Sequence, residues 1–232
     1  GYDEILINAE VPEVIVIMLP DYSIYRSCGY AIGYLTRGCI RSCRWCVEPR
    51  KEGMIRPYRQ WQEIVRDDTG KLVLMDNNIL ACDYGIRQLE SLIGSGYRID
   101  LNQGMDARLV TDEIAEILSR ISWIRFIRFS CDQKSQIAPI RKTVSLLGRY
   151  GVKPYRIFVY LLVTKDIKDA TERVEALKQF HGINIYAQAE RNERMGIMPN
   201  KTQLEFSQRY VYSGRYRSET LEEYRERMKI EI

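Results

Sequence analysis

The feature that most constrains the fold is a regular alternation of short apolar segments with longer amphipathic ones. Six segments rich in β-branched and aromatic residues are predicted as strands; they are Tyr30–Thr36, Lys71–Met75, Tyr97–Leu101, Ile124–Phe129, Arg156–Val163 and Ile183–Ala187. Helices are predicted between and after them; they are Tyr58–Arg66, Tyr84–Ile93, Thr111–Ile121, Ser135–Tyr150, Ile167–Phe180, Lys201–Tyr212 and Ser218–Ile230. Strands that alternate with helices through short loops favour a parallel sheet.

Six strand–helix units are too few for a closed eight-unit barrel, so the pattern indicates a partial barrel or an open doubly wound sheet. The continuous apolar segment Phe158–Val163 is typical of a strand in a sheet that is covered on both faces. Residues 1–29, with Pro12 and Pro20, are predicted as an extended N-terminal lead-in. We expect residues 30–232 to form a single domain, because no low-complexity linker interrupts them.

Charge and cysteine usage narrow the function classes. The net charge is +4, from 35 basic and 31 acidic side chains, which permits anionic ligands but falls short of a typical nucleic-acid binder. No apolar run is long enough to span a membrane. Three of the six cysteines lie within eight residues, which indicates a metal site in a reducing cytoplasm rather than a secreted disulfide framework.

The central motif is formed by Cys39, Cys43 and Cys46, with the spacing Cys-x3-Cys-x2-Cys directly after the first predicted strand. Three thiolates this close together can bind three irons of a cubane cluster and leave the fourth iron open to another molecule. Gly38 permits a tight turn into the loop. We expect Trp45, just before the third cysteine, to shield one side of the cluster from water.

A structural zinc site is the alternative explanation of the three thiols. Zinc takes four ligands in a closed tetrahedron, usually as two close pairs. The fourth ligand would have to be Cys28, Cys82, Cys131 or His181, and none of them belongs to a second Cys-x2-Cys pair. The pattern therefore favours an iron–sulfur cluster.

The cysteine spacing, the aromatic residue before the third cysteine and the preceding Thr36-Arg37-Gly38 resemble the radical S-adenosylmethionine (SAM) superfamily. This resemblance implies a partial (β/α)6 barrel of parallel strands, a [4Fe–4S] cluster on the three cysteines, and SAM bound to the free iron. It implies that SAM is cleaved to methionine and a 5′-deoxyadenosyl radical, which abstracts hydrogen from a substrate. It also implies a reducing partner of the flavodoxin or ferredoxin type.

The second strand of this superfamily usually ends in a Gly-Gly-Glu type motif that receives the SAM amino group. Here the strand is followed by Asp76, Asn77 and Asn78, which depart from that motif and resemble an Asp-Asp-Asn variant. Carboxylate and amide oxygens can accept hydrogen bonds from an ammonium group. A plain Asx turn would explain the same residues.

Polar side chains also follow the other predicted strands, where ligand groups of parallel α/β barrels gather. We expect Asn102 or Gln103 to face the methionyl part or the ribose, and Ser130 and Asp132 to face the ribose. Gln188 or Asn192 is expected to reach adenine or the substrate, and Gln188 is included in the predicted SAM site. Together with Trp45 and residues 76–78, these side chains make up the predicted SAM site.

The substrate is expected to be a small molecule. The compact build resembles a lyase of the superfamily that salvages the modified base queuine, which implies cleavage of a C–N bond in a nucleobase-type substrate. Substrate contacts are predicted for Glu48, Asp83, Arg108, Glu190 and Arg191. Arg108 would alternatively tie loops together through Asp106, and Asn8 or Glu10 would contribute if the N-terminus folds over the barrel.

Two other function classes remain open. One is a radical SAM enzyme that modifies transfer RNA or activates a protein, which a strongly basic surface would favour. The other is an iron–sulfur or zinc binding module without catalysis. Such a module would leave the polar strand ends unexplained.

Overall fold

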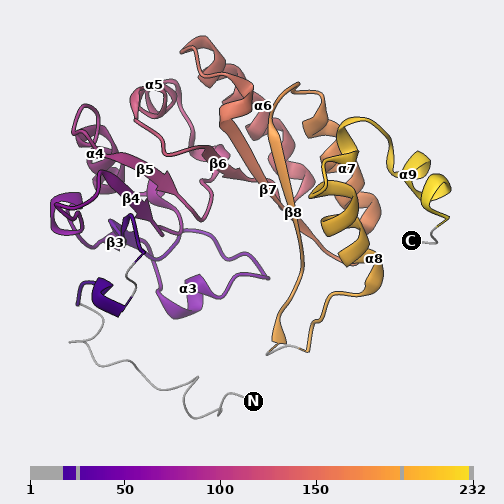
Figure 1. The fold of residues 1–232 in the computed structure, drawn as a ribbon, viewed down its shortest axis with the longest axis horizontal. Helices are drawn as coiled ribbons and strands as arrows, with labels where there is room; N and C mark the ends of the chain where they lie inside the picture. Colours follow the sequence, from indigo (N-terminus) through magenta and orange to yellow (C-terminus); the bar gives the residue numbers. More distant parts are fainter. Residues whose placement is uncertain (1–17, 25–26, 194–195, 230–232) are drawn as a thin grey trace.

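The computed structural model describes residues 18–24, 27–193 and 196–229, which form a mixed α/β fold (Figure 1). Two three-stranded parallel sheets follow one another along the chain. The first consists of β1 (Ala31–Gly33), β4 (Lys71–Leu74) and β5 (Arg98–Leu101), and the second of β6 (Ile127–Ser130), β7 (Ile157–Val163) and β8 (Asn184–Ala189). Each of these six strands overlaps one of the predicted strands, with ends that differ by up to three residues.

The two sheets meet between β5 and β6 through isolated bridges. Ile99 pairs with Trp123, and Met105 pairs with Phe129, both in the parallel sense. The expectation of a parallel α/β fold is thereby confirmed. The expected partial (β/α)6 barrel is not confirmed, since the strands of the described ranges do not close into a barrel.

A largely buried ion pair also connects the two sheets at this junction. Arg128 on β6 donates two hydrogen bonds to Asp100 on β5, of 2.7 Å from Nε to Oδ1 and 2.8 Å from Nη2 to Oδ2. The guanidinium also lies 5.1 Å from the ring centre of Phe158 on β7. These contacts connect three neighbouring strands on one face of the sheets.

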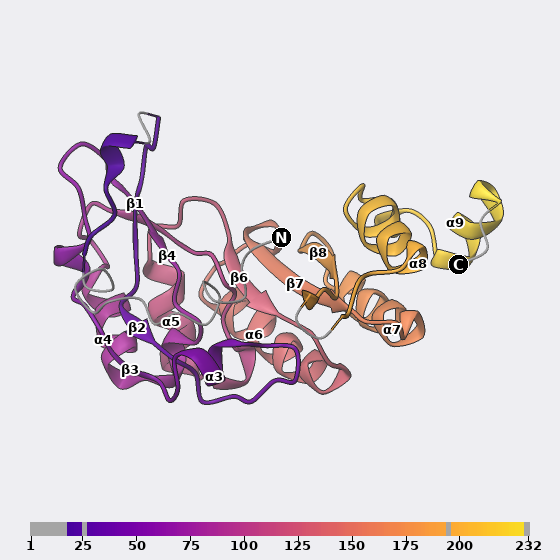
Figure 2. The same cartoon turned by 90° about the horizontal axis from the view of Figure 1, so that it is seen from below.

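Helices lie in a row along the opposite face (Figure 2). They are α4 (Asp83–Ser91), α5 (Asp112–Arg120), α6 (Ile137–Arg149) and α7 (Ile167–Lys178). Thr111 and Asp166 cap α5 and α7 by accepting hydrogen bonds from Ile114 N and Asp169 N. None of the helices in the described ranges is both long enough and apolar enough to cross a membrane.

The side chains of β7 alternate between the two faces. Ile157, Val159, Leu161 and Val163 are buried in the core, while Phe158, Tyr160 and Leu162 are only half-buried. The prediction of a strand covered on both faces is therefore wrong for this segment. The half-buried positions are apolar for another reason. Phe158 packs against the aromatic rings of Tyr160 and Tyr186.

The C-terminal segment packs beside the last strand. Helix α8 (Lys201–Leu204) continues as a π-helical segment, Glu205–Val211, and is followed by α9 (Leu221–Met228). Tyr216 Oη accepts a hydrogen bond from Ile185 N on β8, at 3.3 Å. This contact occupies a donor of the edge strand that would otherwise be available to another chain.

Short elements connect these parts. They are 3-10 turns at Tyr22–Ile24, Trp61–Glu63, Ile79–Ala81, Ala107–Leu109, Lys134–Gln136, Pro154–Arg156 and Arg215–Arg217, the short helix α3 (Glu48–Lys51), and an antiparallel pair of β2 (Thr36–Arg37) with β3 (Arg56–Pro57). Most of the predicted lead-in, including Asn8, Glu10 and Pro12, lies outside the described residues.

The predicted helix Tyr58–Arg66 is wrong, because only the 3-10 turn Trp61–Glu63 forms there. The backbone N–H groups of Tyr58 and Arg59 both donate to the carbonyl oxygen of Leu35, at 2.9 and 3.2 Å. These long-range bonds hold the segment against the start of β2. The apolar spacing alone does not reveal them.

The predicted first strand divides into β1 and β2. Asp76 accepts hydrogen bonds from the backbone where β2 begins. Its carboxylate accepts hydrogen bonds from Leu35 N at 3.1 Å, and from Thr36 N and Oγ1 at 2.5 and 2.7 Å. Burial raises the pKa of Asp76 to about 6, against the lowering effect of these hydrogen bonds. Asp76 thus connects the end of β4 to the start of the loop that carries Cys39, Cys43 and Cys46, which we call the cysteine loop.

The raised pKa of Asp76 predicts a specific dependence of stability on pH. Between pH 3.8 and about 6 the folded chain keeps a proton that the unfolded chain loses, so the free energy of unfolding falls as pH rises. The expected contribution is about 1.4 kcal/mol per pH unit in this window. Urea denaturation of the wild type and of Asp76→Asn, which cannot titrate, should show this slope as their difference. Parallel curves would contradict the prediction.

Candidate functional site

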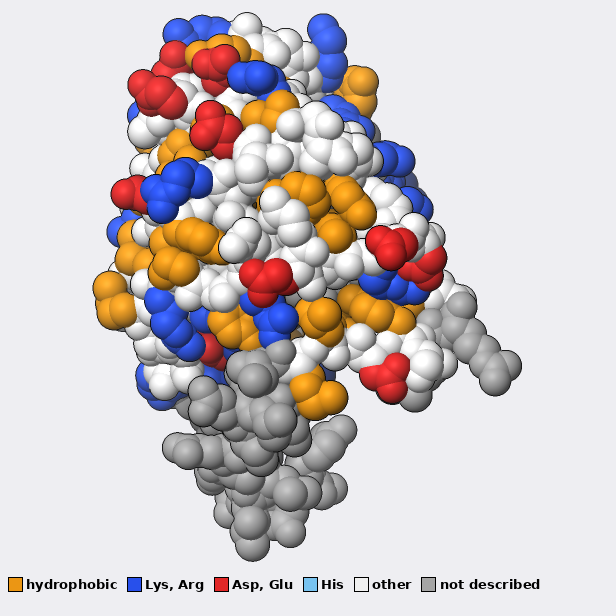
Figure 3. Space-filling model, turned by 90° about the vertical axis from the view of Figure 1, so that its left-hand side faces the viewer, with side chains coloured by type: hydrophobic (Ala, Val, Ile, Leu, Met, Phe, Trp, Pro, Cys, Tyr) orange, Lys and Arg blue, Asp and Glu red, His pale blue; other side chains and the backbone are white. Residues whose placement is uncertain are grey.

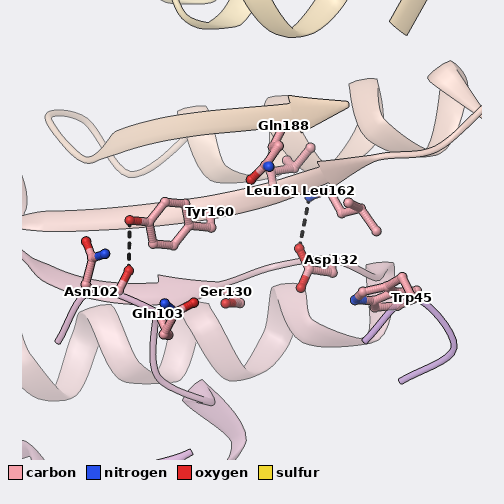
Figure 4. A pocket seen from close by; sticks show the side chains of 9 residues that line it. All are labelled: Trp45, Asn102, Gln103, Ser130, Asp132, Tyr160, Leu161, Leu162 and Gln188. Carbon is pink, nitrogen blue, oxygen red and sulfur yellow. Dashed lines mark hydrogen bonds between the residues drawn. The ribbon is translucent and has the colours of Figure 1, made fainter. Parts of the chain in front are cut away.

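A cavity of about 410 Å³ lies at the carboxyl ends of the strands (Figure 4). Its lining residues are Trp45, Asn102, Gln103, Ser130, Asp132, Tyr160, Leu161, Leu162 and Gln188. Six of these nine are predicted SAM contacts, and the structure brings them together around one space. The three that sequence reasoning missed, Tyr160, Leu161 and Leu162, all belong to β7.

Tyr160 closes one side of the cavity and is held from two directions. Its hydroxyl donates to the carbonyl oxygen of Asn102 at 3.0 Å and accepts from Arg128 Nη1 at 3.2 Å. Burial raises the pKa of Tyr160, so the group stays a neutral phenol that can keep both bonds. The ion pair of Arg128 with Asp100 lies behind it. This arrangement gives the cavity a wall connected to the junction of the two sheets.

Asp132 lies at the end of β6 and faces the cavity between Trp45 and Leu162 (Figure 4). Its Oδ1 accepts a hydrogen bond from Leu162 N at 2.9 Å, and burial raises its pKa. The fully buried Arg173 donates to the carbonyl oxygens of Cys131 and Leu162, at 2.8 and 2.9 Å. Two charged groups therefore hold the ends of β6 and β7 in place, and one of them also borders the cavity.

The cysteine loop begins with a backbone turn that only glycine adopts readily. Gly38 has φ +87°, and a Cβ atom there would lie 2.5 Å from the carbonyl oxygen of Met54 and 2.6 Å from that of Gly53. Cys39 N then donates to Gly53 O at 3.1 Å. The segment at 53–54 therefore lies directly against the entry of the loop.

The thiol of Cys39 accepts hydrogen bonds from two directions. Arg41 N donates to its Sγ at 3.3 Å, and Asn78 Nδ2 donates at 3.6 Å. Asn78 Oδ1 is buried and has no hydrogen-bond partner, so it offers an unused acceptor beside Cys39.

The three thiols of the motif are close enough to affect one another. Burial raises the pKa of Cys43 and Cys46, and the neighbouring thiols add to the rise, while Arg108 opposes it at Cys43. The described part of the chain nevertheless contains no group of three or more His, Cys, Asp or Glu side chains arranged to hold a metal ion. The three sulfur donors match the number and type that a cluster with one open iron requires. The cluster itself stays a prediction.

Two of the three predicted SAM contacts after β4 already make hydrogen bonds within the protein. The carboxylate of Asp76 is bonded to the backbone at 35–36, so it supports the cysteine loop. Asn77 Nδ2 donates to Glu48 Oε2 at 3.0 Å, which connects β4 to α3. Of the three residues, Asn78 has the acceptor that suits a bound ammonium group.

Of the two roles expected for Arg108, the structure shows the bond to Asp106 that ties loops together. It donates to Asp106 from Nε at 2.7 Å and from Nη2 at 2.9 Å, and Arg41 of the cysteine loop donates to the same carboxylate at 2.9 Å. Although burial raises the pKa of Asp106, the hydrogen bonds from Arg108 and Arg41 hold it below its usual value. Asp106 therefore connects the cysteine loop to the segment that follows β5.

The remaining predicted substrate residues do not gather at the cavity. Glu48 begins α3, and Asp83 is exposed at the start of α4. Glu190 is buried after β8, with its carboxylate 4.0 Å from Arg44 Nη2 of the cysteine loop. Arg191 is exposed and pairs with Glu193. None of the four lines the cavity, so their substrate roles stay predictions.

Neither a scan against models of protein families nor a search of curated proteins found a match to this chain.

The turn at Gly38 yields a test with a matched control. Gly38 and Gly53 both have positive φ, of +87° and +72°, but a Cβ at Gly53 meets nothing within 4 Å. Alanine at a left-handed position costs about 1–2 kcal/mol, so Gly53→Ala should lose about that much in urea denaturation. Gly38→Ala should lose more, because its methyl group collides with backbone. Equal losses in the two variants would contradict the close approach of residues 53–54 to Gly38.

Proposed function

We propose that this protein is a radical SAM enzyme, with a [4Fe–4S] cluster on Cys39, Cys43 and Cys46 and SAM in the neighbouring cavity. The observation that carries the proposal is the cavity itself. Six residues predicted as SAM contacts from the cysteine motif and the strand ends line one space beside the cysteine loop. Reduction of the cluster would supply the electron that cleaves SAM.

The residues of the proposed site suit different parts of SAM. The unpaired Oδ1 of Asn78, which lies beside Cys39 but is not a lining residue of the cavity, is an acceptor for the ammonium group. Ser130 and Asp132 offer an oxygen pair at the end of β6 for the vicinal ribose hydroxyls. Gln188 carries both a donor and an acceptor for the adenine edge. Trp45 comes from the cysteine loop and covers the cavity next to the third cysteine.

The strand order supports a partial-barrel arrangement of this site. Strands β1, β4 and β5 in one sheet and β6, β7 and β8 in the other follow in chain order and all run parallel. Their carboxyl ends therefore meet at one edge, where ligands bind in such folds. We assign the two sheets to an open (β/α)6 arrangement with the cavity over its junction.

A row of aromatic side chains supports a planar substrate. The ring centre of Tyr160, which lines the cavity, lies 6.0 Å from that of Tyr186, which lies 5.7 Å from that of Tyr212, and both pairs meet edge to face. Tyr212 is 70% exposed, and an exposed aromatic ring can stack on a base. We therefore propose a modified nucleobase such as queuine as the substrate, with hydrogen abstraction next to a C–N bond leading to its cleavage. Such base salvage would take place in the cytoplasm.

The first test is formation of 5′-deoxyadenosine. Anaerobically reconstituted protein, reduced with dithionite and given SAM, should form it. Cys43→Ala should form none, while Cys28→Ala, which also removes a thiol but outside the motif, should behave as the wild type. Iron content by a colorimetric assay and product by chromatography give both readouts. A protein that holds four irons but forms no product would contradict the SAM site. A protein that holds stoichiometric zinc and no iron would favour a structural zinc site.

The aromatic row gives a separate prediction about the substrate. Base–aromatic stacking contributes about 1–3 kcal/mol, so Tyr212→Ala, which removes the exposed ring of the row, should raise the KM for the base about tenfold or more. Tyr155→Ala removes an exposed ring before β7, outside the row, and should leave KM unchanged. Both variants should bind SAM as the wild type does, measured by isothermal titration calorimetry. An unchanged KM in Tyr212→Ala would contradict stacking on this row.

A further inference from the structure

Positive charge is concentrated at the amino ends of the strands, at the edge of the sheets opposite the cavity. The turns that lead into β5, β6, β7 and β8 lie in residues 94–98, 121–126, 151–156 and 179–183, and residues 213–218 pack beside β8 through Tyr216. Together these segments contain six Lys or Arg side chains and no Asp or Glu, a net charge of +6, whereas the whole chain has +4. The modest overall charge therefore hides a strongly basic edge.

Carboxylates do not neutralise this edge. Five of the six cations form no ion pair with a carboxylate of the described residues; they are Arg98, Arg125, Lys153, Arg156 and Arg217. Asp112 and Glu219, two acidic residues close to these segments, pair with Arg149 and Arg227 instead. On the side of the molecule drawn in Figure 3, by contrast, basic and acidic side chains lie next to one another. The amino ends of the strands thus present charge that is available to an anion.

Neutral acceptors hold three of these cations in place. Arg98 Nη2 donates to the carbonyl oxygen of Ile124 at 2.7 Å, and Arg156 Nη2 donates to that of Trp123 at 3.4 Å. Arg217 Nη2 donates to Asn184 Oδ1 at 3.2 Å. Because neighbouring strands are about 4.8 Å apart, cations at the starts of four successive strands form a row that is too long for one phosphate group to neutralise.

An exposed aromatic ring lies within this row, between two hollows of about 310 Å³ each. Trp123 and Lys153 are among the residues that line one hollow, Arg125 and Asn184 are among those that line the other, and Tyr155 and Arg156 border both. Tyr155 is 63% exposed. We refer to Tyr155 and the five cations Arg98, Arg125, Lys153, Arg156 and Arg217 as the amino-edge patch.

We propose that the amino-edge patch binds single-stranded nucleic acid, with successive phosphates on the row of cations and a base stacked on Tyr155. Proteins that bind single strands combine a positively charged groove, which follows the sugar–phosphate backbone, with aromatic side chains that stack on bases. The patch contains both elements side by side. The two hollows give the nucleotides on either side of the stacked base a place to lie.

This site is separate from the cavity and does not rest on the proposed function. Tyr155 precedes β7, whereas Leu161 lines the cavity near the other end of that strand. At about 3.3 Å per residue, these two positions are about 20 Å apart. A strand bound at the patch therefore leaves the cavity open to SAM and a small substrate, and anchors the protein to a nucleic acid.

The exposed side chains favour a nucleic acid over an acidic protein. The centre of a protein interface is apolar, but the large apolar side chains exposed at this edge are two tyrosines, Tyr150 and Tyr155, with no aliphatic one among the described residues. A free nucleotide would fill one hollow and leave most of the row without a partner. A polymer with regularly spaced phosphates matches the row along its whole length.

The first experiment measures binding of a fluorescent single-stranded RNA of about 12 nucleotides, within the usual site size of such proteins, to the full chain by anisotropy. Arg125→Glu/Lys153→Glu reverses two exposed cations of the patch. Arg141→Glu/Lys142→Glu, the matched control, reverses an exposed Arg–Lys pair on α6. At low salt the patch variant should bind at least about tenfold more weakly than the wild type and the control, because it loses two phosphate contacts.

The dependence on salt adds a readout that a folding defect would not reproduce. The slope of log K against log salt should fall by about 0.7 for each phosphate contact that is lost. The patch variant should therefore have a shallower slope than the control. DNA of the same sequence shows which sugar the patch accepts: equal affinity would assign it to single strands in general, and tighter binding of RNA would assign it to RNA.

The second experiment tests stacking at Tyr155. Tyr155→Ala should weaken binding of the single strand about fivefold or more, whereas Tyr155→Phe, which keeps the ring, should bind as the wild type does. A duplex of the same sequence should bind more weakly than the single strand, because its bases are not free to stack on the ring. Neither measurement needs a cluster, SAM or turnover, so failure of the proposed function would leave both results interpretable.

Three results would overturn the amino-edge patch as a nucleic-acid site. One is equal affinity in the two double variants, whether both match the wild type or both lose binding. Another is unchanged affinity in Tyr155→Ala together with binding of the duplex as tight as that of the single strand, which would exclude stacking. The third is displacement of the RNA by inorganic polyphosphate at equal phosphate concentration, which would show binding of any polyanion.

Discussion

The ion pair between Asp100 and Arg128 is the interaction on which the arrangement of the two sheets depends. It joins β5 to β6 where only isolated bridges connect the backbones, and Arg128 reaches on to Tyr160. A largely buried pair of this kind adds little net stability, but losing one partner leaves the other charge without compensation. We therefore attribute a positional role to it, because it joins strands whose ends surround the cavity.

Much of the site could be predicted because it follows a local rule. Polar residues directly after an apolar strand stand out in the sequence, and parallel strands bring these positions to one edge. Asn102, Ser130 and Asp132 were identified this way. Tyr160 and Leu162 could not be, because they lie inside an uninterrupted apolar segment. Only the pairing with β6 and β8 shows which of its side chains face the cavity.

The predicted helix at 58–66 failed for a different reason, namely hydrogen bonds between distant parts of the chain. The segment has the spacing of a helix, yet its first two amides bond to Leu35. Asp76, whose predicted contact with SAM stays a prediction, likewise bonds to backbone about forty residues earlier. In both cases the hydrogen-bond partner lies too far away in the sequence for a local pattern to reveal it. The hairpin of β2 and β3 was missed for the same reason.

Along β7, side chains that pack in the core alternate with side chains on the face of the cavity. Ile157, Val159 and Leu161 belong to the core, whereas Phe158 and Tyr160 contact mainly one another and their aromatic neighbours. An exchange at Tyr160, which lines the cavity, would change the shape of the ligand space while leaving the helix-facing layer intact. Descendants of this chain could therefore acquire new ligand preferences by substitutions that leave the hydrophobic core unaltered. Evolutionary divergence of specificity would then be limited by chemistry at the cavity rather than by the stability of the scaffold.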